Sequence, residues 1–195
     1  MKRIKLLNFS LFFLLFIGII QAQESSRFVT KFDDFSLRDV NGNKHKLSDY
    51  KNSKAIVIMF ISTQCPVSND YNSRMQSLFE EYSKKGIAFI GINSNKEESV
   101  EEIKKHSEKN NLTFLILKDF DNKIADKFYA QVTPEIFVLN PNFELLYHGR
   151  IDDSRKIEKV TEHNLKETLE AILSGKEIPK KETKAFGCTI ERRTK

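Results

Sequence analysis

The residue best placed for chemistry in this sequence is Cys65, one of only two cysteines in 195 residues. It follows an apolar run at 55–61 that is typical of a strand buried on both faces, and it precedes Pro66, a common first residue of helices. Unpaired backbone N–H groups and the helix dipole stabilise a thiolate there, which lowers its pKa from the free value of about 8.5. We therefore expect a nucleophilic thiolate, the alternative being a cysteine packed as a small apolar residue.

The first residues indicate where that chemistry takes place. Three basic residues within the first five positions precede an apolar stretch at 11–20 and a small-residue cleavage site at Ala22. This order predicts a signal peptide at 1–22, and hence an exported protein that is periplasmic or extracellular. The apolar stretch is shorter than the roughly 20 residues of a membrane-spanning helix. The alternative is an uncleaved N-terminal segment that anchors the protein in a membrane.

Cleavage leaves 173 residues, enough for one ordinary domain, which we place at 28–175. A tail at 176–195 is rich in Lys, Glu and Pro, and an apolar island at 185–190 carries Cys188. The signal peptide takes three basic residues with it, so the formal net charge falls from +5 to +2, and nothing in the balance points to nucleic acid. The charge run at 97–105 predicts a solvated helix face.

Apolar periodicity predicts alternating strands and helices after an N-terminal hairpin that turns at Asn41-Gly42. Strands are expected at 35–40, 46–47, 55–61, 87–92, 114–117, 135–139 and 144–148, and helices at 66–85, 97–109, 122–129 and 162–173. Strands that alternate with helices favour a parallel sheet core, which the last two strands extend as an antiparallel pair.

This order, with a cysteine at the first strand-to-helix junction, resembles the thioredoxin-like superfamily, and within it the AhpC/TSA (redoxin, peroxiredoxin-like) family, over about residues 30–190. Residues 60–68 resemble its active-site region, and 132–138 resemble its loop with a cis-proline. Residues 35–47 are similar to its N-terminal hairpin, and 149–153 with 183–188 to its C-terminal end. The resemblance implies an α/β, three-layer fold: a central mixed β-sheet flanked by helices, with an N-terminal β-hairpin extension.

The resemblance also assigns roles around Cys65, which aligns with the first cysteine of the family's Cys-x-x-Cys motif. Ser68 stands where the second cysteine would be, so the chain resembles an exported monothiol variant. A serine cannot release a mixed disulfide, although Ser68 could hydrogen-bond the thiolate. Ser62 occupies the place of the hydroxyl residue of peroxiredoxins, and together with Thr63 and Ser68 is expected to tune the thiolate.

Two departures from the peroxiredoxin pattern put peroxidase activity in doubt. Ile58 replaces the family's proline, and Thr133-Pro134-Glu135 stands where the family's arginine would lie. Arg150 and the nearby His148 could supply positive charge or a proton donor at a substrate site, with a surface salt bridge from Arg150 to Asp152 or Asp153 as the alternative.

A substrate groove is implied beside Pro134. A cis-proline there would leave the backbone of Thr133 free to pair with an extended peptide or a thiol substrate next to Cys65, whereas a trans-proline would simply precede a strand.

Cys188 is the second thiol of the chain, and two cysteines in an oxidising compartment are expected to pair. In the chain-entropy model, closing so long a loop stabilises a protein by about 4 to 5 kcal/mol. Cys188 could resolve the Cys65 intermediate from a mobile tail, which the solvated linker favours. It could also form a static staple, or resolve a neighbouring subunit.

We therefore expect an exported thiol-based redox protein, a thioredoxin-like oxidoreductase or antioxidant, with Cys65 as nucleophile and Cys188 as possible resolving cysteine. Its partners would be a thiol/disulfide protein or a peroxide, and an external thiol reductant. We expect no cofactor, metal, nucleotide or nucleic acid, because His45, His106, His148 and His163 lack ligand spacing and no phosphate-binding glycine loop is present. The alternative is a non-catalytic thioredoxin-fold module that binds peptides and has a structural Cys65–Cys188 disulfide.

Overall fold

The computed structural model describes residues 30–193, so the expected signal peptide lies outside the described residues. Within this range a seven-stranded mixed sheet has the order β2-β1-β5-β4-β3-β7-β8. Its strands are β1 (Ser36–Asp39), β2 (Lys44–Lys46), β3 (Ala55–Phe60), β4 (Ile87–Asn93), β5 (Leu115–Lys118), β7 (Glu135–Leu139) and β8 (Leu145–Gly149). The central strands β3, β4 and β5 are parallel, and the outer strands pair antiparallel with their neighbours.

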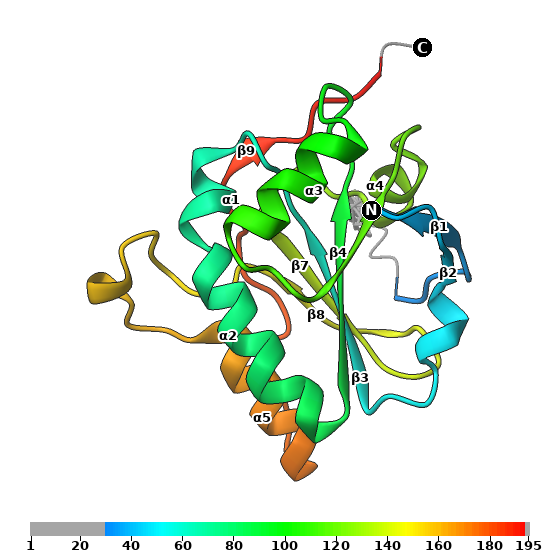
Figure 1. The fold of residues 1–195 in the computed structure, drawn as a ribbon. Helices are drawn as coiled ribbons and strands as arrows, with labels where there is room; N and C mark the ends of the chain where they lie inside the picture. The colour runs from blue at the N-terminus through cyan, green and yellow to red at the C-terminus, as the bar shows by residue number, and fades with distance from the viewer. Residues whose placement is uncertain (1–29, 194–195) are drawn as a thin grey trace, which may run out of the picture.

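The helices and a second, small sheet complete the fold (Figure 1). The helices are α1 (Pro66–Asp70), α2 (Asn72–Tyr82), α3 (Val100–Lys109), α4 (Lys123–Phe128) and α5 (Asn164–Ser174), with 3-10 turns at Leu47–Tyr50, Ser83–Lys85 and Ile157–Lys159. The small sheet pairs β6 (Val132–Thr133) with β9 (Cys188–Thr189), which brings the tail beside α1 in Figure 1. Among residues 30–193 no helix has both the length and the apolar character needed to cross a membrane.

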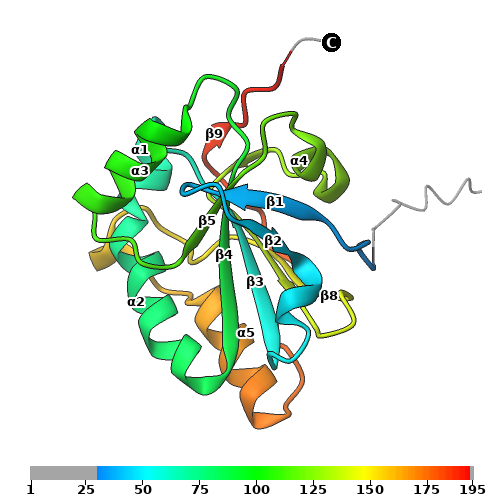
Figure 2. The same ribbon diagram turned by 45° about the vertical axis from the view of Figure 1, so that its right-hand side comes forward.

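Both faces of the sheet are covered, as the apolar run of β3 predicts. Ala55, Val57 and Met59 join one core cluster with side chains of α2, α3 and α5. The alternate residues of β3 join a second cluster, with α4 and the turn that begins at Leu47. Figure 2 shows α1, α2 and α3 on one side of the strands and α4 on the other. The expected three-layer α/β fold is confirmed.

Two local predictions need correction or extension. The helix expected at 66–85 is divided at Tyr71, whose backbone N–H donates to the carbonyl of Ser68, three residues back, and so tightens the turn. The buried hydroxyl of Tyr71 donates to Asp152 at 2.8 Å, which fixes the junction between the two helices against the segment that follows β8. The N-terminal hairpin is present and also joins the main sheet, because β1 pairs with β5.

Candidate active site

Cys65 lies where β3 ends and α1 begins, as predicted. It is the N-cap residue of α1, with Pro66 in the first turn, and its Sγ accepts the backbone N–H of Ser68 at 3.3 Å. An N–H donor aimed at sulfur stabilises a negative charge there. Only 3% of Cys65 is exposed, and it forms a disulfide with Cys188 across 123 residues, with Cα atoms 5.8 Å apart.

The loop that presents Cys65 is held by a buried carboxylate. Both oxygens of Glu98, which is 2% exposed, accept hydrogen bonds from this loop. The backbone N–H and the hydroxyl of Thr63 each donate to one oxygen at 2.7 Å, and Ser62 Oγ donates to the other. Asn93 at the end of β4 also donates to Glu98, at 2.6 Å. Glu98 therefore fixes the backbone directly before the nucleophile.

The sequence interpretation of Glu98 was wrong: it assigned this residue to a solvated helix face. Ser99 caps α3 through a capping box with Glu102, so the helix begins at Val100 and Glu98 lies before its first turn. The Ser-x-x-Glu spacing is a helix-start signal that sequence reading could have used. The polar Asn93 at the end of an apolar strand was a second signal, of a polar site at that strand end.

Ser62 contacts Cys65 through its backbone. Its oxygen accepts the N–H of Cys65 at 3.0 Å and that of Gln64 at 3.2 Å, while its single hydrogen is donated to Glu98. A hydroxyl has only one hydrogen to donate. In this arrangement Ser62 orients the loop and cannot at the same time donate to the sulfur.

Ser68 is fully buried next to Cys65. Besides the N–H that it directs to the sulfur, its Oγ accepts the backbone N–H of Ser62 at 3.2 Å. The structure thus brings together Ser62, Thr63 and Ser68 around Cys65, and links them to each other through Glu98 and the backbone.

Thr133 and Pro134 form the opposite wall of the site. The peptide bond between them is cis, and the carbonyl oxygen of Thr133 lies 3.2 Å from Cys65 Sγ. This contact becomes an S–H···O hydrogen bond only when Cys65 is a reduced thiol. The Thr133 hydroxyl is buried and has no hydrogen-bond partner among the described residues.

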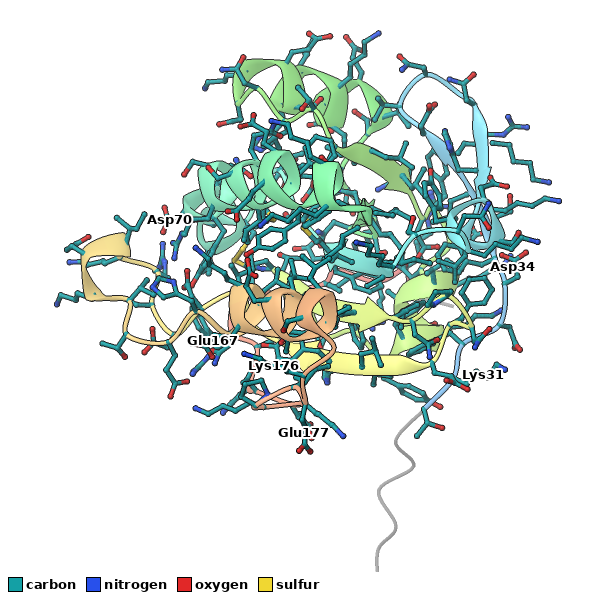
Figure 3. The ribbon with its side chains drawn as sticks, turned by 90° about the horizontal axis from the view of Figure 1, so that it is seen from below. Lys31, Asp34, Asp70, Glu167, Lys176 and Glu177 are labelled. Carbon is teal, nitrogen blue, oxygen red and sulfur yellow. A yellow bond between two sulfur atoms is a disulfide. The ribbon has the colours of Figure 1, made fainter. Side chains whose placement is uncertain are left out.

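The tail runs along the same wall. Thr133 pairs with Cys188 and Val132 with Thr189 in antiparallel register, and the N–H of Ile190 donates to the Gln131 carbonyl at 2.9 Å. The sequence favoured a mobile tail, but in the oxidised protein the Cys188 segment is docked. Its apolar residues explain this, because Ile190 is 2% exposed within the second core cluster. The linker at 176–184 is mostly exposed, and Figure 3 shows Lys176 and Glu177 at the edge of the molecule below α5.

An acid follows the cis-proline in place of an arginine. One oxygen of Glu135, which is 4% exposed, accepts the N–H groups of Gln131 at 2.6 Å and Val132 at 3.0 Å. The other oxygen lies 2.6 Å from His148 Nε2. Glu135 therefore fixes the loop that carries β6. A cavity of about 450 Å3 opens beside this acid, between the β6 loop and tail residues 182–185.

Arg150 does not join the residues around Cys65. Its guanidinium donates to Glu162 at 2.7 Å and to Asn164 at 2.8 Å, and its backbone N–H donates to Thr183. Among residues 30–193 no other partner of this guanidinium is present, and the alternative partner Asp152 instead pairs with Arg74 at 2.6 Å.

A buried lysine is linked to Glu98 through Asn93. Lys118, 3% exposed, donates to the side chain of Asn93 at 2.9 Å and to the carbonyl of Asn95 at 2.6 Å. Burial lowers the pKa of Lys118, and the charges of Glu98 and Asp119 oppose this shift. Burial also raises the pKa of Asp119. Within residues 30–193 no group of three or more His, Cys, Asp or Glu side chains is arranged to hold a metal ion.

Comparison with known proteins adds a family and relatives. A sequence model described as the AhpC/TSA family matches residues 29–148. The chain is 29% identical over 112 residues to the thiol-disulfide oxidoreductase ResA of Geobacillus kaustophilus, which is 57% of this chain and 63% of that protein. It is 28% identical over 119 residues to the peroxiredoxin Bcp of Bacillus subtilis, which is 61% of this chain and 70% of that protein.

A solved structure extends the likeness over most of the chain. The crystal structure of a hypothetical protein from Sinorhizobium meliloti 1021 superposes with a TM-score of 0.80 at 30% identity, covering 85% of this chain and 94% of that one. The similarity therefore continues beyond residue 148.

Proposed function

The chain belongs to the AhpC/TSA family, and we propose that it is an exported thiol-disulfide oxidoreductase in which Cys65 is the nucleophile and Cys188 the resolving cysteine. Its fold is thioredoxin-like, and its relatives include proteins named thiol-disulfide oxidoreductase and peroxiredoxin, which supports thiol-based chemistry of one of these two classes. The observation that carries the proposal is the Cys65–Cys188 disulfide, which supplies the second thiol that Ser68 cannot provide.

The proposed cycle starts from the reduced dithiol. The Cys65 thiolate attacks a sulfur of a substrate disulfide, forms a mixed disulfide and displaces a thiolate, which takes up a proton. The Cys188 thiolate then attacks Cys65 Sγ and displaces the second substrate thiolate. The substrate gains two electrons, the protein is left with the Cys65–Cys188 disulfide, and an external dithiol reductant resets it.

Two features of the site favour disulfide exchange over peroxide reduction. Reduction of a peroxide requires donors that stabilise the negative charge developing on oxygen as the O–O bond breaks. The hydrogen of Ser62 is not free for this, because Ser62 donates it to Glu98. The position after the cis-proline carries the acid Glu135, and Arg150 is engaged by Glu162 and Asn164.

The competing peroxidase cycle would differ in its first step. Cys65 would attack the peroxide to give a sulfenic acid and release the alcohol or water, and Cys188 would then condense with it and release water. Stopped-flow rates of the reduced protein with a peptide disulfide and with hydrogen peroxide separate the two. We expect the peptide disulfide to react with the reduced protein at least 10-fold faster than with free cysteine thiolate. Hydrogen peroxide should react with the protein no faster than with free cysteine thiolate. The opposite order of rates would replace this proposal by the peroxidase.

The non-catalytic alternative, a peptide-binding module with a structural disulfide, is tested by the reactivity of Cys65. In the Cys188→Ser variant, the pH dependence of alkylation gives the thiolate pKa of Cys65. We expect a pKa below that of a free cysteine, because of the Ser68 N–H and the helix terminus. A value at or above about 8.5 would instead support a structural cysteine.

Export and pairing are tested together by the intact mass of protein recovered from the producing cell without reductant. We expect cleavage after Ala22 and a mass two hydrogens below that of the dithiol, with no thiol open to alkylation until reductant is added. A retained N-terminal segment would point to the membrane-anchored alternative. Two alkylatable thiols would show that Cys65 acts alone.

A further inference from the structure

The tail of this protein occupies the edge of β6 as an added strand. Cys188 and Thr189 pair with Thr133 and Val132, and the Ile190 N–H continues the ladder to Gln131. In Figure 1 β9 lies beside α1, so the added strand faces the helix that Cys65 caps. The same edge that holds the tail is thus the surface that any molecule bonded to Cys65 must meet.

The residue before Cys188 is restricted to glycine by this wall. A Cβ atom at Gly187 would overlap the carbonyl oxygen and carbon of Thr133. Because Thr133 is backbone of the cis-proline loop, which Glu135 holds, the wall cannot yield as a flexible side chain would. The edge of β6 therefore accepts a cysteine that is preceded by a residue without a side chain.

The residue two positions after Cys188 enters an apolar pocket. Ile190 is 2% exposed and belongs to the second core cluster, with Phe128 and Ala130 among its members. Burying such a side chain stabilises an association, so a peptide with a polar residue there would bind roughly 10- to 100-fold more weakly. Thr189 between them is exposed and imposes no such requirement.

The docked tail also leaves one polar group at the edge of β6 without a hydrogen bond. The Thr133 hydroxyl is 1% exposed and finds no partner among residues 30–193 while the tail is docked. Beyond Ile190 the contacts are polar: Arg192 pairs with Asp126, which is about half exposed, and donates to the Ala130 carbonyl, and the N–H groups of Glu191 and Arg193 donate to Asn95 and Asn122. The net gain from each such hydrogen bond or exposed pair is no larger than the cost of ordering one residue, so once the disulfide is reduced the tail is a replaceable occupant.

From these contacts we propose that the edge of β6 selects the protein partner by its sequence, and that residues 187–190 stand in for the selected segment. The partner segment is an extended polypeptide with glycine directly before its reactive cysteine and an aliphatic residue two positions after it. This inference rests on the proposed function, because the partner's cysteine forms its disulfide with Cys65.

The test uses the Cys188→Ser variant of the full chain and a peptide with the sequence of residues 185–192, whose cysteine carries a thionitrobenzoate leaving group. The Cys65 thiolate attacks the peptide sulfur, forms the mixed disulfide and releases one coloured thiolate per bond. Two further peptides replace the glycine by alanine or the isoleucine by serine. The thionitrobenzoate disulfide of free cysteine measures the intrinsic reactivity of Cys65.

We expect the parent peptide to react at least 10-fold faster than either altered peptide and than the free cysteine compound. Equal rates for all four compounds, each faster than with an ordinary thiolate, would overturn the docking surface and leave the oxidoreductase standing. Rates no faster than with an ordinary thiolate would instead defeat the proposed function itself. A double variant, Cys188→Ser with Ile190→Asp, removes competition from the protein's own tail and should raise the parent rate further.

Discussion

A single hydroxyl hydrogen decides much of the chemistry next to Cys65. Ser62 donates it to Glu98 and uses its lone pairs for the N–H groups of Cys65 and Gln64. The serine that aligns with the hydroxyl residue of peroxiredoxins is therefore an acceptor toward the nucleophile's backbone here. Glu98 sets that direction, since an ionised carboxylate can only accept.

Glu98→Gln places an amide among groups that all donate to it. The amide NH2 group must then oppose either the Thr63 and Asn93 donors at one oxygen position or the Ser62 hydroxyl at the other. We expect the free energy of unfolding to fall by about 1 to 3 kcal/mol, measured by urea denaturation. Because the substitution also removes a negative charge near the sulfur, the alkylation pKa of Cys65 should fall in the Cys188→Ser background.

Glu97→Gln is the matched control for this prediction, because Glu97 is 64% exposed and pairs with the surface residue Lys96. It should change neither the urea midpoint nor the pH profile. If Glu98→Gln behaved like Glu97→Gln in both measurements, the carboxylate would have no role in positioning the Cys65 loop.

Among the elements, the N-terminal hairpin depends on one carboxylate at its turn. Asp39 accepts the N–H groups of Asn41 and Asn43, each at 2.8 Å, and contacts the side chains of Asn43 and His45. Burial alone would raise the pKa of Asp39, but these hydrogen bonds outweigh it and lower the pKa from 3.8 to about 2. These contacts close the turn of the hairpin, and the hairpin joins the main sheet because β1 pairs with β5.

A lowered pKa makes this contribution depend on pH in a definite direction. It is fully present above the unfolded value of 3.8 and is lost as the pH falls through 2. We expect Asp39→Asn to reduce the free energy of unfolding by about 2 kcal/mol at pH 7 and by almost nothing at pH 2. Urea denaturation at both values measures this, with the exposed Asp33→Asn as control. A deficit that persists at pH 2 would contradict the assignment.

The tail strand makes a second prediction at this scale. In Gly187→Ala the added methyl group meets the Thr133 carbonyl, so β9 must move away from β6. We expect the Cys65–Cys188 disulfide to be reduced at least 10-fold more readily in a glutathione redox buffer, measured by alkylation and intact mass. Thr189→Ala, at an exposed neighbour in the same strand, should leave the equilibrium unchanged. Equal behaviour of both variants would show that the close approach has no energetic consequence.

The main sheet could be predicted from the sequence because its signals are local. The run at 55–61 and the Asn41-Gly42 turn each specify an element within a few residues. The site was predicted only in part. The β6 and β9 pair joins two residues with two others more than fifty positions away, which leaves no periodicity to detect. Glu98 was missed because a buried acid and a solvated acid have the same letter, and only neighbouring residues, the cap at Ser99 and the polar Asn93, distinguish them.

For the whole molecule, the disulfide determines whether the tail is part of the domain. Among tail residues 176–193 only Ile190 is buried, whereas ordering each residue of the chain costs roughly 1 to 2 kcal/mol. We therefore expect the cross-link to hold the tail in place and reduction to release it.

Amide hydrogen exchange of the oxidised and reduced protein measures this release. In the oxidised state the N–H of Ile190 is bonded to Gln131 and should be protected. On reduction, or in Cys188→Ser, we expect its exchange to accelerate at least 100-fold, while amides of β3 and β4 change by less than a few fold. Selective loss in the tail would fit a resolving cysteine that leaves its seat and opens the edge of β6. Unchanged protection at Ile190 would mean a static staple, and it would remove both the resolving step and the exchangeable docking surface, because a tail that stays seated blocks the edge in either redox state.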